Sequence, residues 1–154
     1  MTVTISAGHL QATIAEKGAE LQSLIDVNTN LEYIWQADPA HWGKHAPILF
    51  PIVGALKDNQ YRYKGETYHL PRHGFARDMT FEVVEHKVDY VRLLLASSEE
   101  TKSNYPFDFQ LFVSYELGGD GLVVKYQVVN DSQEDMFFSI GGHPAFNVPL
   151  GEDN

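Results

Sequence analysis

Residues 109–128 read FQLFVSYELGGDGLVVKYQV, and this stretch decides the fold class. Its first half alternates large apolar side chains with mostly polar ones. The turn sequence GGDG at 118–121 then precedes a second alternating run. A period of two places every other side chain on the same face of a strand. The pattern therefore predicts two antiparallel strands, joined by a tight turn, with one face buried.

Three further hairpins are predicted before this stretch. Each has two short runs rich in β-branched and aromatic residues, separated by a turn that contains Gly or Asp. The paired runs are residues 2–6 with 10–15, 61–63 with 66–70, and 80–87 with 90–97. Additional strands are predicted over residues 18–25, 32–35 and 136–140. We therefore expect an all-β protein built as an antiparallel β-sandwich.

Two segments depart from this strand pattern. Residues 47–54, PILFPIVG, are apolar but contain two prolines, which cannot donate to a strand ladder. They predict a buried, extended connector instead of a regular strand. Ser97 and Glu100 resemble a helix capping box, but no amphipathic run follows them, so at most one short helical turn is expected there.

Length, charge and composition limit the classes of function. The chain has 154 residues, which predicts a single domain over residues 1–154. A formal net charge of −10 argues against nucleic acid and against an anionic membrane surface as partners. The absence of cysteine excludes disulfides, thiolate metal sites and cysteine nucleophiles. No signal-peptide pattern or membrane-length apolar run is found, so a cytoplasmic protein is expected.

The segment PRHGFAR, residues 71–77, contains the side chains best suited to bind a polar ligand. His73 can donate a hydrogen bond or carry a proton near neutral pH. The guanidinium groups of Arg72 and Arg77 can hold ligand oxygens with paired hydrogen bonds. The alternative is an ordinary loop histidine whose ring bonds to backbone carbonyl groups.

A second candidate segment is GGHPAF, residues 141–146. Two glycines before His143 permit unusual backbone angles and the close approach of a ligand, and Pro144 stiffens the turn. Glycines that serve only to end a strand would give the same pattern. The segment becomes informative if His143 and His73 come together in space.

A third cluster, His41 and His45 around Trp42, suggests a metal site at first sight. Two histidines four residues apart share a helical face, but Pro39 and Gly43 argue against a helix here, and no carboxylate pair completes a ligand set. We therefore expect no metal. Trp42 can offer an apolar surface to the C–H face of a sugar, although a core tryptophan is the commoner explanation.

Five motifs occur in the order seen in the aldose 1-epimerase (galactose mutarotase) family. They are GAELQSL at 18–24, PILFPIVG at 47–54, HGFAR at 73–77, YPF at 105–107 and GHPAF at 142–146. Together they extend over nearly the whole chain, so the sequence resembles this family, and its LacX-like branch in particular. The resemblance implies the galactose mutarotase-like supersandwich. It also implies interconversion of the α and β anomers of an aldose or sugar phosphate.

The resemblance assigns roles to particular residues. It implies that His143 is the general acid on the ring oxygen, and that His73 hydrogen-bonds the sugar and supports the charge that develops there. Trp42 and Phe146 are expected to contact the sugar. The family usually has an arginine shortly after the second motif, where this chain has Ala55-Leu56-Lys57. Arg77 or Lys57 is the expected substitute. A small-molecule sugar is the expected ligand, with no cofactor.

The resemblance also raises a question of length. The family domain is roughly twice as long as this chain, and its catalytic base is a glutamate in the second half. We therefore expect an incomplete sandwich, the N-terminal portion of a longer protein, with little activity alone. One alternative is a non-catalytic carbohydrate-binding domain. Another is a structural β-domain whose exposed sheet edges favour a homodimer.

Overall fold

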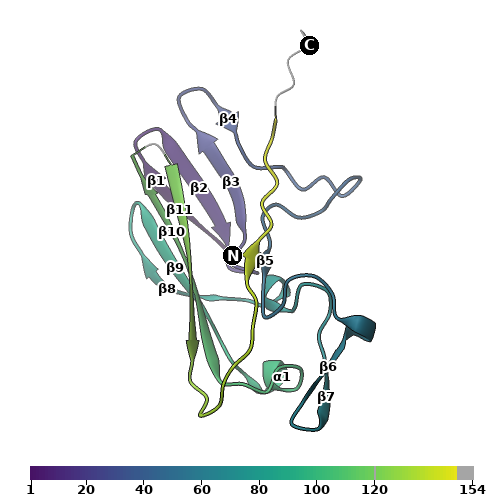
Figure 1. Cartoon of the computed structure of the whole chain (residues 1–154). Coiled ribbons are helices and arrows are strands. Elements are labelled where there is room, and N and C mark those ends of the chain that lie inside the picture. The colour runs from purple at the N-terminus through teal and green to yellow at the C-terminus, as the bar shows by residue number, and fades with distance from the viewer. Residues whose placement is uncertain (120, 149–154) are drawn as a thin grey trace.

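The computed structural model describes residues 1–119 and 121–148, and most of its strands form two four-stranded antiparallel sheets (Figure 1). The first sheet has the order β1-β2-β3-β4. Its strands are β1 (Thr2–Ala7), β2 (Leu10–Ala15), β3 (Leu21–Asp26) and β4 (Leu31–Glu32). The second sheet has the order β11-β10-β9-β8. Its strands are β8 (Glu82–His86), β9 (Tyr90–Ala96), β10 (Phe109–Gly118) and β11 (Gly121–Asn130).

The remaining elements are short and lie outside the two four-stranded sheets. Two small antiparallel pairs join β5 to β12 and β6 to β7. These strands are β5 (Ile48–Leu49), β12 (Gly141–Gly142), β6 (Gln60–Tyr63) and β7 (Glu66–His69). The helical turns are η1 (Lys57–Asn59), η2 (Ala76–Asp78) and α1 (Glu99–Lys102). Within the described residues no helix approaches ten residues, as the sequence predicts.

The two sheets pack face to face, which confirms the predicted antiparallel sandwich. β1 and β2 contact β10, and β1 also contacts β9. The alternating apolar residues of β10 are all buried in the shared core, because strand side chains with a period of two point to one face. They are Phe109, Leu111, Val113, Tyr115 and Leu117.

The second half of the predicted hairpin is less buried than its pattern suggests. β11 pairs with β10 over its full length, from Phe109 opposite Asn130 to Gly118 opposite Gly121. It is the edge strand of its sheet among the described residues. Val124, on the face that the pattern predicts to be buried, is 37% exposed.

The buried connector that the sequence predicts over residues 47–54 is buried at 47–51, but Val53 near its end is 49% exposed. Only Ile48–Leu49 is paired as strand, and residues 48–51 are all buried. The Phe50–Pro51 peptide bond is cis. The connector lies between the two histidine-bearing segments, and its backbone is hydrogen-bonded to both of them.

Three sequence predictions are wrong in detail. The helical turn begins one residue later than expected: Ser98, and not Ser97, is the N-cap, and its capping-box partner is Thr101 in place of Glu100. The Thr101 hydroxyl accepts the Ser98 N–H, and the Ser98 hydroxyl accepts the Thr101 N–H. A buried threonine can therefore supply the same reciprocal bonds that a glutamate would.

The second error concerns residues 136–140, which are extended but form no strand. Their backbone has only scattered partners: the Ser139 N–H donates to the Pro51 carbonyl, and the Phe137 carbonyl accepts the Tyr105 hydroxyl. The bond from Ser139 to Pro51 continues the register of β12 with β5, but Pro51 has no N–H to donate in return, so no regular ladder forms. The strand predicted over residues 32–35 is likewise reduced to β4, with Ile34 in an isolated bridge to Phe146.

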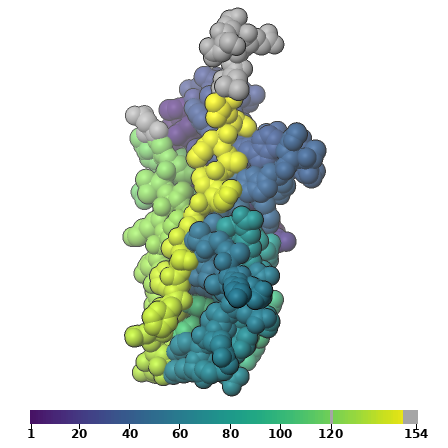
Figure 2. Space-filling model, turned by 45° about the vertical axis from the view of Figure 1, so that its right-hand side comes forward, coloured from purple at the N-terminus to yellow at the C-terminus, as the bar shows by residue number. Residues whose placement is uncertain are grey.

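The segment after β11 runs along the outside of the molecule (Figure 2). In this view the segment, coloured yellow, has β10 and β11 on one side and the chain around residues 40–80 on its other side (Figure 2). Several of its apolar side chains are exposed, among them Phe137 at 71% and Val148 at 72%. The described residues include no helix with the length and apolarity needed to cross a membrane.

Candidate functional site

His143 is positioned by one edge of the buried connector. β12 pairs with β5 through Gly141 opposite Leu49 and Gly142 opposite Ile48. The next residue continues this pairing, because the His143 N–H donates to the Pro47 carbonyl at 3.0 Å. The backbone of His143 is therefore fixed by the connector, while its side chain remains exposed.

His73 is positioned further along the same connector. Its N–H donates to the Gly54 carbonyl at 2.7 Å, and the Gly54 N–H donates back to the imidazole Nδ1 at 3.0 Å. The following residue, Gly74, forms a parallel bridge with Phe50. His73 itself has a φ of +70°, an unusual conformation for a residue with a side chain. These contacts hold the ring in one orientation.

The two histidines therefore lie on one pocket, although they are far apart in the sequence. Their ring centroids are 6.3 Å apart, with an angle of 60° between the ring planes. The indole of Trp42 packs on His143 with a centroid distance of 5.0 Å. The pocket has a volume of about 220 Å³ and is lined by Trp42, Pro47, Leu49, Arg72, His73, Arg77 and His143. None of these described lining residues is a carboxylate.

Both ring nitrogens of His73 face hydrogen-bond donors. The Gly54 N–H donates to Nδ1 at 3.0 Å, and the Arg72 Nε–H donates to Nε2 at 3.2 Å. Burial lowers the pKa of His73 below the usual 6.5, and the positive charges of Arg72 and Arg77 lower it further. The uncharged form of the ring is therefore favoured at neutral pH.

Arg77 supports the loop that carries His73. Its Nη2 donates to the backbone carbonyl of Arg72 at 2.9 Å. Its Nε lies 3.5 Å from the carboxylate of Asp78, which is also paired with Lys44 at 3.3 Å. Arg77 lines the pocket, and its buried Nε makes no hydrogen bond among the described residues.

The other two expected sugar contacts lie outside this pocket. Phe146 is 59% exposed and lines a neighbouring hollow, which also includes His143 and Tyr126. Lys57 lies on the exposed turn η1 and is not among the residues that line the histidine pocket. The structure thus brings together His73, His143, Arg77 and Trp42, and leaves Phe146 beside them and Lys57 apart.

The histidines near Trp42 have other roles. The Nδ1 of His45 lies 2.7 Å from the Trp35 carbonyl, a hydrogen bond within the loop. His41 is exposed, with its ring 6.2 Å from that of Trp35. Among the described residues no three His, Asp or Glu side chains converge as a metal site would require.

Glu20 is a positioning residue that the sequence reasoning did not single out. Its carboxylate is buried and accepts the N–H groups of His45 at 2.9 Å and Ala46 at 3.0 Å. The His45 carbonyl in turn accepts the Ala145 N–H. Glu20 therefore fixes the chain that enters the connector and, through it, the segment of His143. A lone acidic residue at the start of a buried strand was the available signal.

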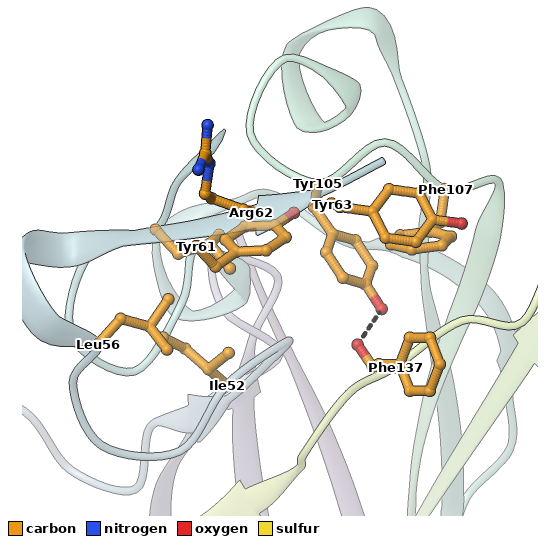
Figure 3. A pocket seen from close by; sticks show the side chains of 9 residues that line it. Ile52, Leu56, Tyr61, Arg62, Tyr63, Tyr105, Phe107 and Phe137 are labelled. Carbon is orange, nitrogen blue, oxygen red and sulfur yellow. Dashed lines mark hydrogen bonds between the residues drawn. The ribbon is translucent and has the colours of Figure 1, made fainter. Parts of the chain in front are cut away.

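A second hollow lies beside the β6–β7 hairpin and is mainly aromatic (Figure 3). Its volume is about 290 Å³. The Tyr105 hydroxyl donates to the Phe137 carbonyl at 3.0 Å, and the Tyr61 hydroxyl donates to the Asn104 carbonyl at 2.9 Å. Arg62 is the one charged residue among its described lining residues. This hollow therefore offers apolar packing and few free polar groups, in contrast to the histidine pocket.

Comparisons with known proteins agree with the fold and with the five motifs. The family model described as Aldose 1-epimerase matches residues 1–153. The plasmid-encoded protein LacX of Lactococcus lactis subsp. lactis is 37% identical over 158 residues, covering 99% of this chain and 52% of LacX.

Solved structures show the same relationship. The galactose mutarotase related enzyme from Lactobacillus acidophilus is 47% identical with a TM-score of 0.97, covering 100% of this chain and 51% of that one. A galactose mutarotase-like protein from Lactobacillus casei is 44% identical with a TM-score of 0.95, covering 99% and 52%. This chain spans about half the length of these relatives. It belongs to the aldose 1-epimerase family.

Proposed function

We propose that this chain contributes two histidines, His73 and His143, to an active site that interconverts the α and β anomers of an aldose. One observation carries the proposal: His73 and His143 are held by the same connector and line one pocket with Trp42. The two imidazoles can hydrogen-bond the hydroxyl groups of a sugar, and the indole can pack against the apolar C–H face of its ring.

The chemistry requires two proton transfers. A group gives a proton to the ring oxygen while another removes the proton of the anomeric hydroxyl, and the bond between the anomeric carbon and the ring oxygen breaks. The open-chain aldehyde then rotates about its C1–C2 bond and closes to the other anomer. In this proposal His143 gives the proton, and His73 hydrogen-bonds the substrate and supports the developing charge.

The base is the missing component. None of the described residues that line the pocket is a carboxylate, and the chain spans about half the length of its relatives. We therefore expect residues 1–154 alone to bind sugar weakly and to catalyse little. The full-length gene product that carries this chain is the species to assay.

The test measures anomer exchange of aldoses by NMR in the presence of the full-length gene product. We expect catalysis by the wild type and a loss of at least about 100-fold in His143→Ala, the range typical of a removed general acid. His69→Ala is the matched control, because His69 is exposed on β7, outside the pocket. A His143→Ala variant that folds and retains the wild-type rate would exclude this function.

A second candidate is a carbohydrate-binding domain without catalysis. It is favoured by the lack of a carboxylate among the described lining residues. In that case sugars would shift the NMR signals of His73 and His143 in the full-length protein, yet anomer exchange would stay at the uncatalysed rate.

A further inference from the structure

Trp35 is bound through its backbone to the segment that carries His143. Its N–H donates to the carbonyl of Ala145 at 3.0 Å, two residues after His143. Its carbonyl accepts the Nδ1–H of His45 at 2.7 Å. The Ala145 N–H donates in turn to the His45 carbonyl at 3.0 Å. The backbone of Trp35 is therefore fixed against both the His143 segment and the residues that enter the connector.

The indole of Trp35 holds the loop that carries Trp42. Its Nε1–H donates to the Trp42 carbonyl at 2.8 Å. The Trp42 N–H bonds within its own turn, to the Asp38 carbonyl at 2.8 Å. Among the described residues, the bond from the Trp35 indole is therefore the one hydrogen bond that ties the Trp42 backbone to a residue outside that turn.

The ring of Trp42 is the part of this loop that reaches the two histidines. It packs on the His143 ring with a centroid distance of 5.0 Å and an angle of 45° between the ring planes. It also lines the pocket together with His73. Trp42 is only half-buried, and most of the residues 36–41 before it are exposed. Few buried contacts hold the backbone of this loop, so the bond from Trp35 matters for the position of the indole.

We propose that Trp35 is a positioning residue of the site, whose indole N–H holds the ring of Trp42 against His143. The proposal rests on the proposed function, in which Trp42 packs on the sugar and His143 gives the proton. Trp35 is not among the described residues that line the pocket, so it acts through Trp42. Loss of its N–H would let the Trp42 ring move relative to His143 and the sugar, and a small misplacement of groups that orient a substrate lowers the rate strongly.

Trp35→Phe tests the indole N–H alone, because phenylalanine keeps an aromatic ring and both backbone hydrogen bonds. In the full-length gene product we expect this variant to lower kcat/KM for anomer exchange by roughly tenfold. Tyr61→Phe is the matched control. It removes a bond of the same kind, from a half-buried aromatic side chain to the Asn104 carbonyl at 2.9 Å, beside the aromatic hollow. It should lower stability to a similar extent and change kcat/KM by less than about twofold.

A double-mutant cycle separates positioning from a general loss of structure. If Trp35 acts through Trp42, the change Trp35→Phe should alter kcat/KM by less than about twofold when Trp42 is already alanine. A tenfold loss that persists in the Trp42→Ala background would show that the N–H supports the fold and not the Trp42 ring. That result, or a wild-type kcat/KM in the single variant Trp35→Phe, would overturn the inference while leaving the proposed function intact.

An NMR measurement keeps the inference testable if no sugar is turned over, which would refute the proposed function alone. In ¹³C-histidine-labelled protein, the ring signals of His143 are assigned by their loss in His143→Ala, and the ring current of Trp42 shifts them. We expect Trp35→Phe to move these signals toward their positions in Trp42→Ala, and Tyr61→Phe to leave them in place. His143 signals that keep their wild-type positions in Trp35→Phe would show that the Trp42 ring does not depend on Trp35.

Discussion

Gly74 lies directly against the backbone of Phe50: a Cβ on this glycine would be 2.2 Å from the Phe50 carbonyl oxygen and 2.7 Å from the Pro51 nitrogen. The φ of Gly74 is +71°, a conformation that side chains disfavour. Both restrictions arise where the His73 loop contacts the buried connector. The orientation of His73 therefore depends on the absence of a side chain at the next residue.

Gly74→Ala is accordingly expected to destabilise the protein by at least about 2 kcal/mol, because backbone atoms would have to move. Urea unfolding of the full-length protein measures the effect. Gly65→Ala is the control: its φ is +88°, but a Cβ there meets nothing within 4 Å, so only the conformational cost of about 1 kcal/mol applies. Equal losses in the two variants would show that the contact with Phe50 is unimportant.

Glu20→Ala tests the link between a buried carboxylate and the site. The change leaves the N–H groups of His45 and Ala46 without their acceptor, at a cost of about 1–3 kcal/mol for each buried group. Because the Ala145 N–H bonds to the His45 carbonyl, anomer exchange should fall as well.

Two further variants separate the role of Glu20 as an acceptor from other effects. Glu20→Gln keeps one carbonyl oxygen and should retain most of the stability. Glu66→Ala removes an exposed carboxylate on β7 and should have little effect, about 0.5 kcal/mol or less. If Glu20→Ala unfolds at the same urea concentration as Glu66→Ala, the proposed support is absent.

The sequence predicted the strands better than it predicted the site. The alternation in residues 109–117 is a local signal, and β10 buries the face that it specifies. Residues 136–140 have similar strand propensity, yet their neighbour is the connector, where Pro51 cannot donate to a ladder, and no local pattern reveals that neighbour. Contacts between residues that are far apart in the sequence are likewise not encoded in a window of a few residues.

The proximity of His73 to His143 also depends on tertiary contacts. It depends on Pro47 and Gly54 accepting the two histidine N–H groups from the same connector. The local sequence identified the two histidines only as candidates, and the order of the family motifs indicated that they share one site. The hydrogen bonds of the His73 ring could not be predicted at all, because they depend on the distant Gly54 N–H and on the conformation of Arg72.

His73 should also make stability depend on pH. Its pKa in the folded protein is lowered below 6.5 by burial and by the charges of Arg72 and Arg77, so the unfolded chain binds the proton more tightly. Its contribution to stability is therefore fully present above about pH 6.5 and is lost as the pH falls toward the folded pKa. Protonation of Nδ1 would also place two donors face to face at Gly54.

We expect the free energy of unfolding of the wild type to fall more steeply below about pH 6.5 than that of His73→Gln, whose side chain does not titrate there. Urea unfolding at several pH values measures the difference. Parallel curves for the two proteins would mean that His73 has an ordinary pKa in the folded state.

The last prediction concerns the residue before His143. A Cβ on Gly142 would lie 2.8 Å from the Tyr126 hydroxyl oxygen but 3.9 Å from the ring carbon that bears it. Gly142→Ala should therefore displace the Tyr126 hydroxyl or the backbone of β12, which also positions His143. We expect lower stability and slower anomer exchange in this variant.

Tyr126→Phe supplies a direct check, because it removes only the atom responsible for the clash. In the double variant the remaining contact of 3.9 Å is ordinary van der Waals packing, so much of the loss should be recovered. Urea unfolding of both single variants and the double variant gives the coupling free energy, which we expect to be about 1 kcal/mol or more in favour of the double variant. Additive effects would show that Gly142 is needed for another reason than its distance to Tyr126.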